Sequence, residues 1–451
     1  MPERILDNMR TKMELSQGKK KAVTGLWALI TAGSVFSPVL TKEAFLFSVL
    51  FCTGLLGCIL LLLLRKGMAI GSVRIKYLVP LLVVGVSFAG YGIVHSVLGY
   101  IAIGLTFAVA IPATALIMGE YQLTDIFTCI ARACIIVFGI LMVISFFFGP
   151  PLQLDQYASV LGNPNLLANF LIVSIPCTIF LVVQSLQAGK NASATLFVFL
   201  LGMEISVCFF SNMRTAMFAV ILQLMATLLA LLVIFFRRER QKRWLKLARR
   251  AVVCVLCFAA AFWVTFTLLT SAMDLLEDPQ NGGQTGSTTS MGDSITIAGD
   301  RFTKGFESNE NDAFTSGRLG IWQQYIGELR ITGHAKESMD IVNGDRAYKD
   351  TNAHNYYIQI AYSAGIPAGL AFAAAIVMMM YDLLRVYCRF IFKRGNLEST
   401  ILFFICVALA LVANSITAAG YMLYSYVIPT YFWVMMGPLL IRKNDLQKQP
   451  A

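Results

Sequence analysis

Polar and basic residues gather where four helices of this sequence are expected to begin. The four segments are Gly162-Asn-Pro-Asn165, Ser211-Asn-Met-Arg214, Ser316-Gly-Arg318 and Thr351-Asn-Ala-His354. Three of them carry a basic side chain in or next to the first turn, where a cation opposes the helix macrodipole at a cost of roughly a few tenths of a kcal/mol. A bound anion would reverse that sign, because free backbone N–H groups and guanidinium groups favour a phosphate or pyrophosphate. The sequence therefore predicts an anion site built from distant parts of the chain.

Each of these residues also has a purely structural interpretation. Arg214 could extend to the lipid headgroups, Arg318 could be a solvated loop charge, and His354 could cap a helix or lie at an interface. The turn at Asn163 and Pro164 is a common way to start a helix. The functional interpretation rests on the four segments taken together.

The elements that must position these residues are membrane helices, because the chain is too apolar for a soluble protein. Of its 451 residues, 57% are hydrophobic and 14% are charged, and the mean hydropathy is +0.70, outside the range of soluble domains. A net charge of +11 would suggest a nucleic-acid partner in a soluble protein. Here the basic residues lie in short segments between apolar runs, including the stretch 237–250, where they act as topology signals. We expect the lipid bilayer, and no nucleic acid, as a partner.

A ruler of about 20 apolar residues per span cuts the chain into about twelve segments. Because lipid offers no hydrogen bonds to the backbone and these runs lack strand alternation, we expect an all-α polytopic fold. The predicted spans are 22–40, 45–64, 77–95, 100–118, 126–148, 165–186, 193–210, 214–236, 251–271, 355–384, 399–419 and 424–441.

Lysine and arginine positions set the predicted orientation. They gather in the N-terminal tail, in the connections near residues 65–76, 237–250 and 385–394, and at 442–443. These segments fall on one side of the count, which is then the cytoplasm. The predicted order is a cytoplasmic basic tail (1–21), helices one to nine (22–271), a large extracytoplasmic loop (272–353), helices ten to twelve (354–441) and a cytoplasmic tail (442–451). The location is a bacterial cytoplasmic membrane.

The large loop has two unlike parts. Residues 278–312 are acidic and rich in Gly, Ser and Asn, which favours a loosely ordered segment. Residues 316–331 place Leu319, Trp322, Ile326 and Leu329 at helical spacing, with Ser316 suited to the N-cap and Gly333 just past the end. This pattern predicts an amphipathic helix at the outer membrane surface, with Trp322 and Tyr325 at the level of the headgroups.

Charges and thiols inside the spans have mainly structural interpretations. Glu204 and Arg132 are the clear intramembrane charges; we expect them to face protein or water, and they could pair. The ten cysteines lie in or beside apolar runs, which predicts membrane-buried thiols. Cys254 and Cys257 have redox or zinc spacing, but no histidine or second cysteine pair lies near them, so packing is the favoured interpretation.

Four segments, their order and the position of the large loop are similar to those of a known family. The segments are Gly162-Asn-Pro-Asn-Leu-Leu-Ala-Asn169, Ser211-Asn-Met-Arg-Thr-Ala216, Ser316-Gly-Arg-Leu-Gly-Ile-Trp322 and Ala353-His-Asn-Tyr-Tyr-Ile-Gln-Ile-Ala-Tyr-Ser-Ala-Gly-Ile-Pro-Ala-Gly-Leu370. Together they resemble the O-antigen ligase and polysaccharide polymerase superfamily of bacterial inner-membrane glycosyltransferases, over roughly residues 160–380. The family often has a Gly-x-Gly turn after the surface helix, where this chain has Gly333-His334-Ala335.

The resemblance implies a GT-C-like fold and a glycan donor linked to undecaprenyl diphosphate. It implies that Arg214 and Arg318 bind the pyrophosphate and that His354 is the essential histidine. We expect the flanking polar residues to bind substrate, although the sequence leaves the role of His334 open; they are Asn163, Asn165, Ser211, Ser316, Asn355 and His334. The acceptor would be a glycan, a lipid or a protein, and a flippase or a chain-length regulator would be a natural partner protein.

The residues are compatible with that chemistry. The chain has no nucleotide-binding phosphate loop and no cytoplasmic domain for a nucleotide sugar, so an activated donor must supply the energy. When an acceptor hydroxyl attacks the anomeric carbon, arginines and helix N-termini can stabilise the departing diphosphate. His354 would accept the hydroxyl proton or orient a substrate. No ligand cluster indicates a required metal, and we expect no cofactor.

The main alternative is a lipid-linked oligosaccharide flippase or a polysaccharide transporter. A transporter predicts charges along a central pathway and repeat symmetry between halves, whereas the polar residues here gather at one face. A membrane anchor without activity would leave the basic helix starts unexplained. The sequence leaves open the sugar and its linkage, the oligomeric state, and the choice between polymerase, ligase and protein O-glycosyltransferase.

Overall fold

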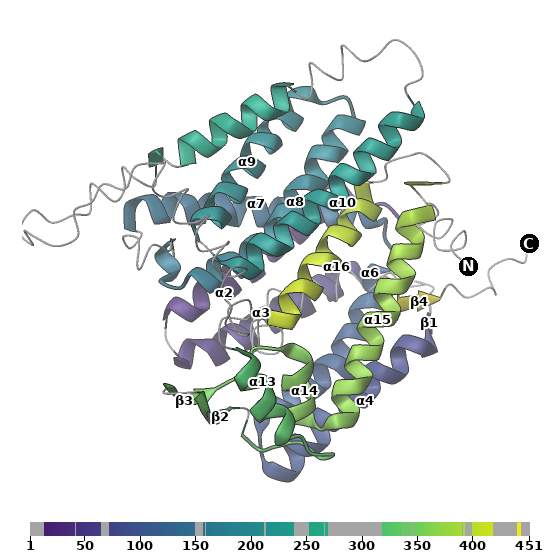
Figure 1. Ribbon diagram of the computed structural model, residues 1–451. Coiled ribbons are helices and arrows are strands. Elements are labelled where there is room, and N and C mark those ends of the chain that lie inside the picture. The colour runs from purple at the N-terminus through teal and green to yellow at the C-terminus, as the bar shows by residue number, and fades with distance from the viewer. Residues whose placement is uncertain are drawn as a thin grey trace, which may run out of the picture.

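The protein is a bundle of long helices with a small module of mixed structure at one end (Figure 1). This computed structural model describes residues 13–40, 42–64, 72–148, 157, 159–211, 213–238, 252–265, 267–268, 318–336, 338–343, 346–389, 391–392, 399–417 and 440–442.

The helices of the first half are α2 (Gln17–Leu40), α3 (Lys42–Leu63), α4 (Ile75–His95), α5 (Leu98–Leu105), α6 (Ile111–Met118), α7 (Leu123–Phe148), α8 (Pro164–Gln187), α9 (Asn191–Phe210) and α10 (Arg214–Arg238). A π-helical turn at Thr106–Ala110 joins α5 to α6, and a 3-10 turn lies at Ser159–Leu161. The second half contains α13 (Arg318–Gly327), α14 (Tyr356–Ala364), α15 (Ile366–Arg389) and α16 (Ser399–Thr417). Two short antiparallel sheets pair β1 (Ser72–Val73) with β4 (Ile441–Arg442) and β2 (Met339–Asn343) with β3 (Arg346–Thr351).

Helix composition confirms a polytopic membrane protein. In the part of the chain that the structure describes, 7 helices are long and apolar enough to cross a membrane, namely α4, the continuous α5–α6 segment, α7, α8, α9, α15 and α16. Helices also occupy the other predicted spans as far as residue 268. The predicted twelfth span, at 424–441, lies almost wholly outside the described residues, so the count of twelve stays a prediction.

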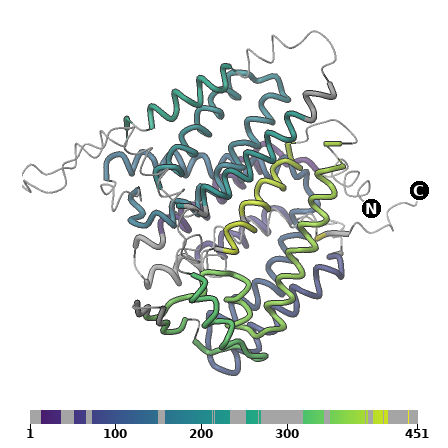
Figure 2. Tube along the Cα trace, viewed as in Figure 1, coloured from purple at the N-terminus to yellow at the C-terminus, as the bar shows by residue number. Residues whose placement is uncertain are grey.

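Helices α8 and α16 form the centre of the bundle (Figures 1 and 2). Helix α8 packs against α7, α9, α10 and α16, and 89% of its most apolar window is buried. Rings of Phe127, Phe180 and Phe403 contact one another where α7, α8 and α16 meet. Because both central helices are covered on nearly all sides, any polar side chain on them needs a partner within the protein.

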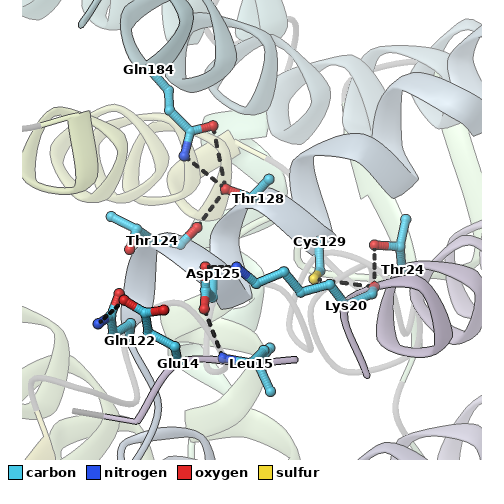
Figure 3. Close-up of polar contacts among 10 residues, drawn as sticks. All are labelled: Glu14, Leu15, Lys20, Thr24, Gln122, Thr124, Asp125, Thr128, Cys129 and Gln184. Carbon is cyan, nitrogen blue, oxygen red and sulfur yellow. Dashed lines mark hydrogen bonds and ion pairs between the residues drawn. The ribbon is translucent and has the colours of Figure 1, made fainter. Parts of the chain in front are cut away.

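The ends of the bundle opposite the module are fastened by ion pairs. The Lys20 ammonium lies 2.6 Å from Asp125 at the start of α7, and the same carboxylate accepts a hydrogen bond from the Leu15 amide at 2.8 Å (Figure 3). In a similar way the ammonium of Lys76 lies 2.6 Å from the carboxylate of Asp382. These contacts place the starts of α2, α4 and α7 and the last turns of α15 at one end, which is the side of the basic connections.

The predicted tenth span, 355–384, is divided in two. Helix α14 ends at Ala364 and α15 starts at Ile366, while Gly365 between them has φ 96°. The amide of Ile366 donates to the carbonyl of Arg330 at 3.0 Å. A Cβ at Gly365 would lie 2.0 Å from the Ile331 carbonyl oxygen. The single long span was therefore wrong, because the chain after α13 packs its backbone directly into this break.

The surface helix exists, but its buried face differs from the predicted one. Helix α13, the β2–β3 hairpin and α14 share a small core of Ile321, Tyr325, Ile341, Ala353 and Tyr362. We call this unit the surface module. Ile326, predicted on the apolar face, is 54% exposed. Tyr325, expected at the headgroups, is fully buried and donates to the carbonyl of Thr351 at 2.5 Å.

The disagreement arises because α13 packs on the protein through Ile321 and Tyr325 rather than on lipid through the predicted stripe. The helix also ends at Gly327, well before Gly333. The hairpin was not predicted from the sequence at all.

Candidate functional site

The backbone around His354 is held in an uncommon conformation at the start of α14. His354 has φ 48°, in the left-handed region that non-glycine residues rarely adopt. Asn355 follows as the N-cap, and its side-chain oxygen accepts from the amides of Tyr357 and Ile358 at 3.1 and 3.2 Å. The carboxamide of the buried Gln359 accepts from the amide of Ala353 at 2.9 Å. These bonds fix the residues on both sides of His354, which explains how the strained conformation is maintained.

Arg318 reaches the same place from α13. The charge of Arg318 acts on His354, and together with burial of the imidazole, the larger cause, it lowers the pKa of His354 to about 4. Burial also lowers the pKa of Arg318 itself, although a guanidinium remains charged at any ordinary pH. The site therefore combines a neutral imidazole with a desolvated cation, beside the N-terminus of α14.

The last turn of α16 connects this helix start to the middle of the bundle. The Asn355 amide donates to the carbonyl of Ile416 at 3.1 Å, and the hydroxyls of Ser415 and Tyr357 are 3.1 Å apart. The amide of Asn414 donates to the side-chain oxygen of Asn169 on α8 at 3.1 Å. One end of the bundle holds the last turn of α16 and the first turns of α8, α10 and α14. We call this end the site end.

Helices α8 and α10 start at the same end of the bundle, because the amide of Tyr157, shortly before α8, donates to the carbonyl of Phe210, shortly before α10, at 3.0 Å. The Gln223 amide on α10 donates to the Ile172 carbonyl on α8 at 2.9 Å. Pro164 begins α8 eight residues before Ile172 and Arg214 begins α10 nine residues before Gln223, so both starts lie about 12–14 Å from this contact along their helices. The positive ends of both helix dipoles therefore point toward the site end.

The position of Arg214 is known from its backbone only. The Sγ of Cys406 on α16 lies 3.6 Å from the carbonyl of Gln223. Since α10 and α16 run in opposite directions, the start of α10 at Arg214 lies level with residues about nine positions after Cys406, near Ser415. The backbone of Arg214 is thus close to the turn that binds Asn355. Its side chain lies outside the described part of the structure.

The predicted start of α8 is confirmed in detail. Asn163 is the N-cap, with φ −139°, and Pro164 is the first helical residue. The side-chain oxygen of Asn163 accepts from the amide of Asn165 at 2.9 Å, and both side chains are partly exposed. The cap explains Asn163 structurally, so a role in substrate binding for either residue stays a prediction.

The remaining predicted residues are Ser211, Ser316 and His334. Ser211 is fully buried, and its hydroxyl donates to the carbonyl of Cys208 at 2.7 Å. Ser316 lies outside the described residues. His334 stacks on Tyr362 with ring centroids 4.0 Å apart and an interplanar angle of 5°, and its Nδ1 lies 3.0 Å from the Tyr362 carbonyl.

Tyr362 lies six residues along α14 from its first residue, about 9 Å from the helix start. His334 therefore sits at the opposite end of α14 from His354, where its carbonyl accepts from the hydroxyl of Tyr100 at 3.1 Å. The structure does not bring the two histidines together.

The intramembrane charges do not pair. Glu204 is fully buried and accepts a hydrogen bond from Ser174 on α8, whereas Arg132 is exposed on the surface of α7. Arg132 therefore does not face protein, and the other expected possibility, that it faces water, stays a prediction. None of the ten cysteines forms a disulfide; six of them are buried, Cys254 and Cys257 are partly exposed, and Cys58 and Cys388 are exposed.

Sequence reasoning missed Asn414, Ser415 and Tyr357. The first two stand near the end of an apolar run, and a buried asparagine in a membrane helix is itself a signal, since an unsatisfied amide is costly there. Tyr357 gave no comparable signal, because tyrosine is common near the ends of membrane helices.

The fold and the site define a polytopic helical membrane protein with a cationic and polar site at the ends of several helices, beside a surface module. A family model described as O-antigen ligase matches residues 196–373, which include α10, α13 and α14 with Arg214, Arg318 and His354. The match supports the resemblance to the O-antigen ligase and polymerase superfamily seen in the sequence. This family supports a ligase or polymerase type of function with glycosyltransferase-like activity. A comparison with curated proteins finds no match for the chain.

Proposed function

We propose that the protein transfers a glycan from an undecaprenyl-diphosphate-linked donor to an acceptor hydroxyl at the outer face of the bacterial cytoplasmic membrane. The observation that carries this proposal is the proximity of a neutral, conformationally fixed His354 to the partly buried cation of Arg318 at the start of α14. The family match covers both residues.

The diphosphate of the donor would occupy the space near Arg318 and the helix starts. Arg318 offers a planar set of donors that suits phosphate oxygens. The N-termini of α8, α10 and α14 add positive dipole ends, and Arg214 stands at the first position of α10. Donor binding would offset the cost of holding cations at these helix starts, which is the reason for choosing a diphosphate over a neutral ligand.

In the transfer step, the acceptor oxygen forms a bond to the anomeric carbon while the bond from that carbon to the diphosphate oxygen breaks. The acceptor proton moves to His354, and the electron pair of the broken bond stays on the departing lipid diphosphate. Arg318 and the helix N-termini stabilise the charge that develops on this leaving group. His354 thus takes up the proton, and Arg318 and the helix N-termini balance the negative charge of the leaving group.

A pKa of about 4 makes His354 neutral, and so able to accept a proton, but it also makes the free imidazole a weak base. The bound diphosphate would correct this weakness. Its negative charge would offset that of Arg318 and stabilise the imidazolium, which raises the pKa of His354 in the complex. The base would thus become strong only when the donor is in place.

We further propose that the site end faces the exterior, with both termini in the cytoplasm. The basic connections lie at the opposite end, as the positive-inside rule requires of the cytoplasmic side. Reporter tags at residues 240 and 290 should then report cytoplasm and exterior respectively. Tags that report the same side would contradict this topology.

Reconstitution tests the proposed function. Liposomes that contain the purified protein, supplied with external lipid-diphosphate glycan and an acceptor, should form a new glycosidic bond without any nucleotide. His354→Ala should abolish most of this product, whereas His95→Ala is a matched control because His95 is exposed next to Tyr91 and distant in sequence from the site. Movement of fluorescent donor between leaflets with no new bond, in the presence of acceptor, would instead identify a flippase.

A further inference from the structure

We infer that the last turn of α16 is a positioning element of the site, with Asn414 and Ser415 as positioning residues. Neither residue is assigned a role by the family match, which ends at residue 373. The inference rests on the proposed function, because its effect is measured on glycan transfer.

Asn414 joins α16 to the start of α8. Its amide donates to Asn169 at 3.1 Å, and both side chains are almost fully buried, with exposures of 3% and 7%. A buried amide pair of this kind is geometrically specific, since shifting either helix leaves polar groups without partners in an apolar interior. The pair therefore fixes the depth of the α8 start, and with it Asn163, relative to α16.

Ser415 and Ile416 join the same turn to α14. The Ser415 hydroxyl is bonded to that of Tyr357, and the carbonyl of Ile416 accepts from Asn355. The carbonyls in the last turn of a helix have no partner within that helix. Ile416 is one residue from the end of α16, so its carbonyl is available for Asn355 without any loss of helical hydrogen bonds.

The two sets of bonds act on His354 through its immediate neighbours. Asn355 follows His354 directly, and Tyr357 is in the first turn of α14. The helical conformation is interrupted at Gly365, between α14 and α15. The direction of α14 is therefore not set by a continuous helix with α15. The α16 turn supplies a second fixed point, on the side of α14 where the catalytic histidine lies.

Misplacing a reacting group by about 1 Å can lower a rate by about 10²-fold, even when the ligand still binds. Loss of the Ser415–Tyr357 bond should therefore lower kcat and leave donor affinity nearly unchanged, because Arg318 and the helix dipoles remain. We expect kcat to fall by about 10-fold or more in Ser415→Ala and in Tyr357→Phe. The double variant should be no slower than Ser415→Ala, because both changes remove the Ser415–Tyr357 bond and Ser415→Ala also removes the bond of 2.8 Å to the Val412 carbonyl.

The experiment measures glycan transfer in right-side-out membranes that contain their own donor and acceptor, together with binding of undecaprenyl diphosphate to each purified variant. Ser415→Thr keeps a hydroxyl and should recover most of the rate. Thr227→Val is the matched control. It removes a hydroxyl on α10 that lies 3.5 Å from the sulfur of Cys406, and Cys406 is on α16 like Ser415 but deeper in the membrane. This control should keep the kcat of the unaltered protein.

Asn414→Leu, which is close in shape, gives an independent test of the α8 connection and should also lower kcat with donor binding retained. If the unaltered protein is active and both Ser415→Ala and Asn414→Leu keep full kcat, the positioning role is refuted while the proposed function stands. An equal loss in Thr227→Val would likewise refute it, because general loosening of α16 would then explain the effect. If the unaltered protein transfers no glycan, the proposed function fails and this inference fails with it.

Discussion

Two different pH dependences should appear in the kinetics of glycan transfer, one for the free enzyme and one for the donor complex. The profile of kcat/KM reports groups of the free enzyme, and that of kcat reports the complex. In the free protein His354 has a pKa of about 4 because of burial and the charge of Arg318. The acid limb of kcat/KM should therefore lie near pH 4, well below the ordinary histidine value.

In the complex, one phosphate charge about 6 Å from the imidazole, at an effective dielectric constant of about 20, would stabilise the imidazolium by about 3 kcal/mol, or about 2 pKa units. The acid limb of kcat should then lie near pH 6. Above each limb the imidazole is neutral and active; below it the imidazolium cannot accept the acceptor proton. The sign follows from the depressed pKa, because a lower value extends activity toward acid.

The assay is initial-rate transfer from about pH 3 to about pH 8 at limiting and saturating donor, so that both limbs are covered, with each sample returned to neutral pH to exclude irreversible unfolding. His95→Gln should keep both limbs, and His354→Gln should lose them along with most of the rate. Coincident limbs near pH 6.5 would refute the reasoning, since that result would mean that neither burial nor the charges of Arg318 and the bound diphosphate shift the pKa of His354.

Further outcomes follow from the same geometry. Arg318→Ala should abolish binding of undecaprenyl diphosphate, and Arg318→Lys should restore only part of it, because a point charge cannot reproduce the bidentate guanidinium. The control is Arg330→Ala, at a side chain that is 63% exposed. Equal binding in the two alanine variants would remove Arg318 from the site. His354→Gly should unfold at a higher temperature than His354→Ala by an amount equivalent to about 1 kcal/mol, because only glycine is relaxed at φ 48°; equal melting temperatures would contradict the strain. Gly365→Ala should reduce the folded yield sharply, since its Cβ would lie 2.0 Å from the carbonyl oxygen of Ile331; a normal melting curve would show that the junction adapts.

The sequence predicted those features that depend on local patterns. Hydropathy located the helices, because spanning a membrane imposes length and apolarity on each segment separately. The cap at Asn163 and Pro164 was also predictable, since it involves adjacent residues only. The proximity of Arg318 to His354 was expected, because each is a basic residue at the predicted start of a helix.

Features that depend on contacts between distant segments were not predictable in the same way. The break at Gly365 exists because the chain after α13 returns to it, and no pattern within α14 or α15 reveals that neighbour. His334 was among the polar residues expected to bind substrate, yet it packs on Tyr362 at the other end of α14 from His354. Asn414 is recognisable in the sequence as a polar residue in an apolar run, but its partner Asn169 is 245 residues away.

The most direct test of the account is a single-turnover measurement with donor already bound. His354→Gln should bind undecaprenyl diphosphate within a few-fold of the unaltered protein, and should form the glycosidic bond about 10²- to 10⁴-fold more slowly, as expected for the loss of a general base. The reverse pattern, in which His354→Gln transfers glycan at the normal rate or fails only in donor binding, would contradict the role assigned to His354 at the start of α14.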